Sequence, residues 1–290
     1  MELTVISGKG GTGKTTVAAA LVRLSGARAL ADCDVDAPNL SLLFSGSDIR
    51  KTHFFAGVKA EIDRRFCTLC GRCEQICRFG AVMGGVVDTL RCEGCGACEL
   101  VCDVDAIKMR PQKSADVYLT RLENAFLSRA EMEIGSDGSG KLVAELRKNA
   151  RALGEELIII DGSPGIGCPV ISSVTASDVV LIVTEPTQSG FDDYQRVAQL
   201  CAHFGVKTLV CVNKHDLNPA VTLAIEIDAA DRGIEVVGEI PYDDTVTASI
   251  NALRPVTDDP DSAAGMAINK MWERLKPILA SLKKEEEAME

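Results

Sequence analysis

The chain has 290 residues, near the upper size for one hydrophobic core, so we expect one large domain with an insertion, or two domains. Its net charge of -11 argues against nucleic acid as a partner, because no excess of Lys and Arg is present to displace counterions. No apolar run is long enough to span a bilayer, and the first residues resemble a strand rather than a signal peptide. A cytoplasmic location is therefore expected.

The first predicted unit is an apolar strand at residues 3–7, followed by a glycine-rich turn and a helix that ends at Gly26. The turn matches the phosphate-loop pattern G-x-x-x-x-G-K-[ST]. Lys14 is expected to reach the β- and γ-phosphates of ATP or GTP, and the hydroxyl of Thr15 to bind Mg²⁺. The expected nucleotide-binding residues of this loop are Gly8, Lys9, Gly10, Gly11, Thr12, Gly13, Lys14, Thr15 and Thr16.

A second strand at residues 28–34 leads into the stretch ADCDVDAPNL, and the alternation of strands and helices then breaks between Phe54 and about Gln112. Eight of the twelve cysteines lie in this break. Because disulfides are rare in the cytosol, metal ligation is the first expectation for them. We interpret the break as an inserted domain at 57–112, within a nucleotide-binding domain made of 1–56 and 113–290.

The cysteines form two blocks, CTLCGRCEQIC and CEGCGACELVC, each with the spacing C-x2-C-x2-C-x3-C of bacterial ferredoxins. In that arrangement three cysteines of one block and the fourth of the other hold each 4Fe-4S cluster, so an α+β ferredoxin-like insertion is predicted. The alternative is zinc, since four-thiolate zinc sites also use C-x2-C pairs. The expected ligands are Cys67, Cys70, Cys73 and Cys102 for cluster 1, and Cys77, Cys92, Cys95 and Cys98 for cluster 2.

The two blocks depart from the ferredoxin pattern at one position. Ferredoxins usually have a proline after the fourth cysteine, whereas this chain has Arg78 and Asp103 there. We expect the change to affect the exposure or potential of the clusters, but not their ligation.

Four later apolar runs, at residues 156–161, 177–185, 206–213 and 234–241, read as buried parallel strands, and the segments between them have helical spacing. The predicted fold is α/β, with a doubly wound, mostly parallel sheet of the P-loop type. Asp161 lies at the carboxyl end of the first of these runs. In P-loop proteins a carboxylate at this place contacts Mg²⁺ through water, and we expect Asp161 to do so. Glycines 165 and 167 would let the following loop respond to the γ-phosphate.

The string KGGTGKTT resembles the deviant Walker A motif of the MinD, ParA and Mrp ATPases, a superfamily that includes the nitrogenase iron protein. The resemblance implies that Lys9 reaches across a nucleotide-sandwich dimer to the phosphates on the other subunit, where it would act like an arginine finger. It also implies that Asp34 orients the attacking water and lies near Mg²⁺. The expected catalytic residues are thus Lys9, Lys14 and Asp34, and those expected to hold Mg²⁺ are Thr15, Asp34 and Asp161.

The same resemblance places Asn213 and the segment at Pro241 around the base. The sequence NKHD at 213–216 also resembles the guanine-binding motif of GTPases, but the rest of the match favours adenine. Cys168 lies seven residues after Asp161, the offset of a cluster-ligating cysteine in the nitrogenase iron protein. It is either an extra metal ligand at a dimer axis or a small residue packed at a helix start.

Taken together, the motifs resemble the MinD-superfamily ATPases that carry an inserted ferredoxin domain, which implies Mg-ATP hydrolysis and two 4Fe-4S clusters. The first hypothesis is an ATP-switched dimer that assembles or delivers a metal–sulfur cofactor, and the second is an ATP-gated electron donor to a metalloprotein. The third, a spatial positioning ATPase, fits poorly because the tail KEEEAME does not resemble a basic membrane anchor. Expected partners are a second copy or a paralogous ATPase, and a small metal-cofactor-binding protein of the NifX type.

Overall fold

The computed structural model describes the backbone of residues 1–289 and the side chains of residues 1–284. Most side chains of the tail KEEEAME, used above to argue against membrane association, lie outside the described residues. Within the described part, no helix has the length and apolar character needed to cross a membrane.

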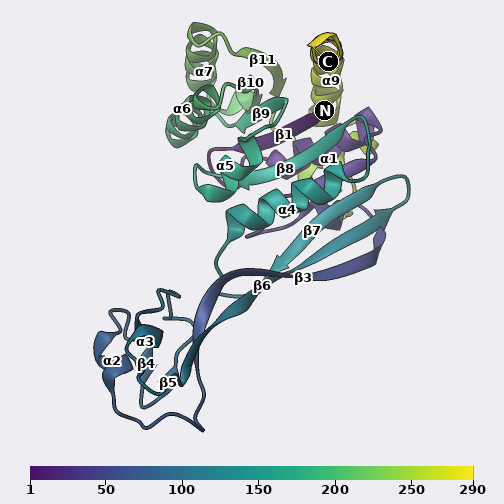
Figure 1. Cartoon of the computed structure of the whole chain (residues 1–290). Coiled ribbons are helices and arrows are strands. Elements are labelled where there is room, and N and C mark those ends of the chain that lie inside the picture. Colours follow the sequence, from purple (N-terminus) through teal and green to yellow (C-terminus); the bar gives the residue numbers. More distant parts are fainter. Residues whose placement is uncertain (290) are drawn as a thin grey trace. The chain divides into compact units, whose positions relative to one another are not determined.

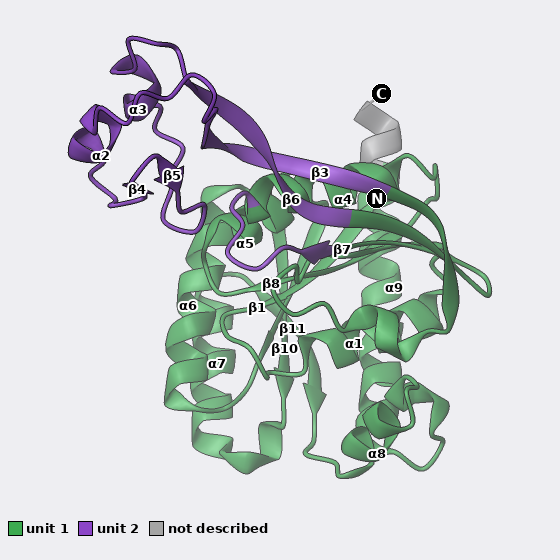
Figure 2. Cartoon of the chain, turned by 90° about the horizontal axis from the view of Figure 1, so that it is seen from below, with its two compact units in different colours: residues 1–51, 117–130, 139–290 green, residues 52–116, 131–138 purple. Residues whose placement is uncertain are grey.

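The chain divides into two compact units, which are coloured separately in Figure 2. The first contains residues 1–51, 117–130 and 139–290, and the second contains 52–116 and 131–138. Strands β3 (Gly46–Ile62) and β6 (Ile107–Leu122) contribute residues to both units, so the expected limits at 57 and 112 fall inside continuous strands. The expected domain limits therefore stay a prediction.

A nine-stranded sheet, in the order β11-β10-β9-β1-β8-β2-β7-β6-β3, forms the scaffold of the described chain. From β11 to β7 each neighbouring pair is parallel, which confirms the predicted fold class for this part. Asp32 at the end of β2 is in register with Asp161 in β8, so the carboxyl ends of these strands lie together. The remaining strands of this group are β1 (Glu2–Ser7), β2 (Ala29–Asp32), β7 (Phe126–Met132), β8 (Ile158–Pro164), β9 (Val179–Thr184), β10 (Lys207–Asn213) and β11 (Glu235–Ile240).

Helices cover both faces of this sheet, as Figure 1 shows. Successive residues of β1 point to opposite faces: Val5 packs in the core under α1 and α9, and Ile6 in the core under α5, α6 and α7. The helices of the unit are α1 (Lys14–Ser25), α4 (Ser139–Arg151), α5 (Cys168–Val174), α6 (Gln188–His203), α7 (Pro219–Asp231), α8 (Thr245–Asn251) and α9 (Ala263–Met289), with short 3-10 turns η1 (Leu40–Leu43), η2 (His215–Leu217) and η3 (Val256–Asp258).

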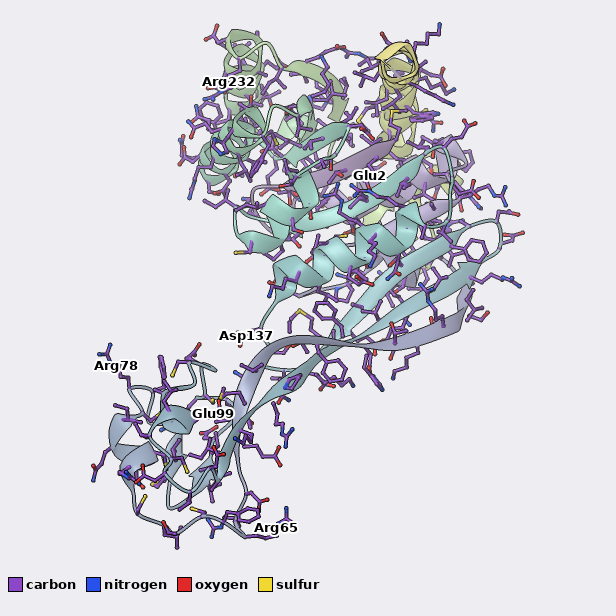
Figure 3. All side chains as sticks on the ribbon, viewed as in Figure 1. Glu2, Arg65, Arg78, Glu99, Asp137 and Arg232 are labelled. Carbon is purple, nitrogen blue, oxygen red and sulfur yellow. The ribbon has the colours of Figure 1, made fainter. Side chains whose placement is uncertain are left out.

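The second unit has little regular structure besides the ends of β3 and β6. It contains the short helices α2 (Arg72–Ile76) and α3 (Ala97–Leu100) and the antiparallel pair β4 (Val82–Met83) and β5 (Val86–Val87). Side-chain sulfur atoms gather around α2 and α3 in Figure 3. Cysteines form much of its small core, in which Cys92 and Cys98 are buried and Cys73, Cys77 and Cys102 pack against them.

Candidate nucleotide site and cysteine pocket

The phosphate loop connects β1 to α1. Its shape depends on Gly13, which has φ of +91° and lies where a Cβ atom would be 2.4 Å from Nδ2 of Asn213. At Gly10 and Gly11, by contrast, a Cβ atom would meet nothing within 4 Å. The loop is therefore open on one side, as a loop that receives a phosphate chain must be.

Lys14 lies buried among carboxylates at the start of α1. Its Nζ is 2.5 Å from Oδ1 of Asp161 and 3.3 Å from Oδ2 of Asp34. The hydroxyl of Thr15 donates to Oδ2 of Asp161 at 2.6 Å. The structure thus brings together the four side chains that sequence analysis assigned to phosphate and Mg²⁺ binding.

The charges of these groups depend on one another. Burial by itself lowers the pKa of Lys14, but the negative charges of Asp161 and Asp34 outweigh that effect, so the pKa of Lys14 is raised. Burial also raises the pKa of Asp34, and the neighbouring Lys14 opposes this rise only in part. A divalent cation would fit this set, since Thr15, Asp34 and Asp161 supply the oxygen ligands that Mg²⁺ prefers. When bound, Mg²⁺ would neutralise phosphate charge there.

Asp32 has a structural role beside this site. Its carboxylate accepts hydrogen bonds from the backbone N–H of Asp34 at 3.3 Å and of Leu40 at 3.0 Å. Because the side chain is fully buried near Asp161, its pKa is raised to about 8. Asp32 therefore shapes the turn that presents Asp34.

Lys9 contacts residues at the carboxyl end of β9 in its own chain. Its Nζ lies 2.7 Å from Oε1 of Glu185 and donates to the hydroxyls of Thr187 at 3.2 Å and Ser189 at 3.1 Å. Lys214 lies 3.3 Å from the other oxygen of Glu185. Burial tends to raise the pKa of Glu185, but the two lysines outweigh it and lower the pKa.

Sequence reasoning missed Glu185, Thr187 and Ser189 as neighbours of the phosphate loop. The available signal was the polar stretch TEPTQS directly after a buried parallel strand, because such strand ends meet at one edge of a sheet. The role of Lys9 on an opposite subunit stays a prediction.

Asn213 lies against the phosphate loop. Its side-chain Nδ2 donates to the carbonyl of Thr12 at 2.7 Å, and its Oδ1 accepts from the N–H of Lys214 at 3.0 Å. Asp216, the aspartate of the GTPase-like stretch, accepts from the N–H of Tyr242, which follows Pro241. The asparagine therefore supports the phosphate loop, and its contact with a base stays a prediction.

In the second unit, a cavity of about 160 Å³ gathers the four cysteines expected at cluster 1. They come from both blocks, because Cys102 of the second block lines the same cavity as the first three cysteines of the first. The N–H groups of Arg72, first the backbone and then the guanidinium, lower the pKa of Cys70 and so favour the thiolate that ligates metals. The lining cysteines are Cys67, Cys70, Cys73 and Cys102.

The fourth cysteines of the two blocks have equivalent surroundings. The sulfur of Cys77 accepts a hydrogen bond from the N–H of Ala81 at 3.3 Å, and the sulfur of Cys102 accepts one from Ala106 at 3.3 Å. Hydrogen bonds from backbone amides are among the features that tune iron–sulfur ligands. Within the described residues, however, no three His, Cys, Asp or Glu side chains converge closely enough to hold a metal ion.

The other four cysteines lie in the first unit. Cys33, Cys201 and Cys211 are buried in its core, whereas Cys168 is exposed at the first residue of α5. A metal at Cys168 stays a prediction.

The fold and the phosphate loop together define a P-loop ATPase. Comparison with known families gives the same result, since the model of the CobQ/CobB/MinD/ParA nucleotide binding domain matches residues 3–256. The chain belongs to this family.

Relatives cover nearly the whole chain. An uncharacterized protein of Methanocaldococcus jannaschii is 34% identical over 282 residues, which cover 96% of this chain and 98% of that protein. An uncharacterized ATP-binding protein of the same organism is 25% identical and covers 92% of this chain and 95% of its own length.

Solved structures agree on the fold. The septum site-determining protein MinD of Pyrococcus horikoshii, complexed with Mg-ADP, has a TM-score of 0.61 and 20% identity over 97% of this chain and 98% of its own. The cell division ATPase MinD of Pyrococcus furiosus has a TM-score of 0.60 and 20% identity over 96% of this chain and 98% of its own.

Proposed function

We propose that this ATPase is an iron–sulfur protein whose nucleotide-dependent dimer acts in the assembly or delivery of a metal–sulfur cofactor. The observation that carries the proposal is the cavity lined by cysteines of both blocks, because the interleaved ligation of two 4Fe-4S clusters requires that grouping. The matching hydrogen bonds at Cys77 and Cys102 support a second, equivalent site. Four thiolates at each site would hold the clusters, which would supply redox chemistry.

Dimerisation would connect ATP to these clusters. The side chain of Lys9 is 29% exposed and is held only at its Nζ, by Glu185, Thr187 and Ser189, so it is available to a second copy once these contacts exchange. A lysine supplied by the opposite subunit would neutralise charge that develops on the transferred phosphoryl group. The partner would be a second copy or a paralogue, and a small cofactor-binding protein would receive or supply the metal–sulfur centre.

Anaerobic isolation of the full chain tests the iron–sulfur part. We expect about eight iron and eight labile sulfide per chain, from two cubane clusters. Stoichiometric zinc and a colourless protein would contradict the proposal. Incubation with ATP and a cluster-free acceptor then tests delivery, in which iron moves to the acceptor. Incubation of the dithionite-reduced protein with ATP and the same acceptor carrying its cluster tests electron donation, in which the donor is oxidised, the acceptor is reduced and no iron moves.

The names of the MinD structures favour a second candidate, a positioning ATPase. Those proteins are described as acting in septum-site determination and cell division. Sedimentation with anionic liposomes with and without ATP discriminates the two functions. ATP-dependent co-sedimentation would favour positioning, and cofactor assembly predicts none.

A further inference from the structure

The segment at residues 131–138 connects β7 to α4 but belongs to the second unit. It is anchored on the carbonyl of Ser114 in β6, which accepts from the N–H of Glu133 at 2.8 Å and from the hydroxyl of Ser136 at 2.9 Å. At Gly138 a Cβ atom would lie 2.2 Å from Cβ of Ala56, so the backbone runs directly against β3. The segment is therefore fixed to the strands that carry the cysteine blocks.

Lys59 joins this segment to the second cysteine block. Its side chain is 11% exposed, and its Nζ donates to the carbonyl of Cys92 at 2.6 Å and lies 3.3 Å from Oδ2 of Asp137. Asp137 is labelled in Figure 3 on the segment that leads into α4. The backbone at Gly135 also runs close to Leu90, two residues before Cys92, since a Cβ atom there would lie 3.0 Å from Cδ2 of Leu90.

At its other end the segment continues into α4, which begins against α5. A Cβ atom at Gly140 would lie 3.1 Å from the carbonyl oxygen of Cys168 and 3.2 Å from its Cβ, so the two helix starts are in close contact. The loop before α5 follows Asp161, which contacts Lys14 and Thr15 in the nucleotide site. A continuous series of contacts and covalent connections thus runs from Asp161 to the carbonyl of Cys92.

The first cysteine block has different polar contacts. Arg72 pairs with Asp103, next to the fourth ligand of cluster 1. Arg64 donates to the carbonyls of Gly84 at 2.9 Å and Gly85 at 3.0 Å, which hold the β4–β5 turn over Cys67. These contacts join parts of the second unit to each other, whereas Lys59 joins the second block to the segment that continues into the nucleotide-binding unit.

We propose that Lys59 is a positioning residue through which the nucleotide state acts on the second cysteine site rather than on the first. The inference rests on the proposed function, because it assigns the coupling of ATP and clusters to one of the two sites. If the start of α5 moves when nucleotide binds, α4 and residues 131–138 move with it, and Lys59 transmits the displacement to the loop at Cys92. Proximity alone is not coupling, so the two sites must be shown to respond together.

Hydrogen–deuterium exchange of the full chain, isolated anaerobically, tests this proposal. With Mg²⁺ and a non-hydrolysable ATP analogue, we expect the exchange rates of amides at 90–98 to change by about fivefold, in either direction, while those at 66–74 stay within about 1.5-fold. Lys59→Met keeps the length of the side chain but removes both polar contacts, so the response at 90–98 should disappear. Lys108→Met is the matched control, because the ion pair of Lys108 is with Asp105 at 3.0 Å and not with the segment at 131–138, so its loss should leave the response intact.

The outcomes separate the two levels of the proposal. A protein without iron, or one that does not bind the analogue in calorimetry, refutes the proposed function and with it this inference. If iron and nucleotide both bind, either of two results overturns this inference but not the proposed function. In the first, the exchange rates at 66–74 change with the analogue. In the second, those at 90–98 change in Lys59→Met as they do in the wild type. If Lys59→Met folds poorly, Asp137→Asn replaces it, because the side chain of Asp137 is 64% exposed and its change should disturb folding less. The exchange response at 90–98 should then be reduced. An unchanged response would count against the proposal.

Discussion

Lys14 is the residue on which the nucleotide site depends most directly. Its ammonium neutralises Asp161, which is fully buried, and Asp34. Lys14→Ala should abolish tight Mg-ATP binding, because the phosphates lose their cation while uncompensated buried carboxylates remain. Those carboxylates should also cost about 3–5 kcal/mol of folding free energy at neutral pH. Calorimetric titration and urea unfolding measure the two effects, and wild-type affinity in the variant would exclude this role.

Lys9 should behave differently, because its contacts lie at the edge of the site. Lys9→Ala should keep nucleotide binding but lose most ATP-dependent dimerisation and turnover, as expected for a cation that acts on the opposite subunit. Glu185 would still pair with Lys214, so the folding free energy should change by no more than about 0.5 kcal/mol. Turnover at the wild-type rate would show that Lys9 has no role in trans.

Asp243 supports the start of α9 and gives a pH-dependent prediction. It accepts from the N–H of Ala264 at 2.9 Å and the hydroxyl of Ser262 at 2.7 Å. Burial tends to raise the pKa of Asp243, but these donors outweigh it and hold the pKa well below its usual range. Asp243→Ala should therefore lose about 2 kcal/mol of folding free energy at pH 7.

The sign of the pH effect follows from the lowered pKa. The stabilisation is complete above the unfolded pKa of about 3.9 and is lost as pH falls through the folded pKa, so wild type and Asp243→Ala should converge in acid. Urea unfolding at pH 7 and near pH 3 measures this convergence. Asp244→Ala is the control, since the side chain of Asp244 accepts only from the hydroxyl of Tyr242 among the described hydrogen bonds. A constant difference between wild type and Asp243→Ala would exclude the charged hydrogen-bond network.

At the residue scale, the groups that a local motif specifies are those that the structure brings together. Lys14 and Thr15 follow from the loop pattern, and Asp161 from its place at the end of an apolar strand. Glu185 could not be found in this way, because its contact with Lys9 joins residues 176 positions apart through the pairing of β1 with β9. The hydrogen bond from Leu40 to Asp32 and the raised pKa of this carboxyl depend on tertiary structure and burial, which no motif shows.

At the element scale, the parallel strands were predicted because they are buried on both sides and read as continuous apolar runs. β3 was not, since most of its 17 residues are exposed and it lies at the edge of the sheet. Its sequence GSDIRKTHFFAGVKAEI therefore lacks the apolar run that indicates a buried strand. The same exposure explains why the start of an insertion was expected near Phe54, although the strand continues to Ile62.

The two cysteine blocks give a prediction about which cluster the fourth cysteine of each block ligates. Each enters its short helix through a glycine with positive φ, 77° at Gly71 and 76° at Gly96, and each fourth cysteine follows that helix. Because the fourth cysteine should ligate the cluster of the other block, Cys77→Ser should damage the cluster held by Cys92, Cys95 and Cys98. Cys102→Ser is the reciprocal control and should damage the other cluster. Electron paramagnetic resonance of the reduced variants distinguishes the two losses, and damage to the cluster nearest in sequence would contradict interleaved ligation.

At the scale of the whole molecule, the chain crosses between the two units at four points. Three crossings lie inside the strands β3, β6 and β7, and the fourth is where the segment at 131–138 leads into α4. The proposed role of Lys59 uses the last of these crossings, because Lys59 pairs with Asp137 and the segment at 131–138 continues into α4.

Communication between the units has a thermodynamic consequence that does not depend on the route. If ATP changes the reduction potential of a cluster, then reduction must change the affinity for ATP by the same free energy. Coupling of about 1 kcal/mol would shift the midpoint of a one-electron couple by about 40 mV and the analogue's affinity by about fivefold. We expect both shifts, measured by potentiometric titration with and without a non-hydrolysable analogue and by calorimetry on oxidised and reduced protein. Potentials and affinities that stay constant, with or without a partner, would make the second unit a passive docking module. The reason is that ATP can shift the potential of a cluster only if it binds the oxidised and reduced protein with different affinities.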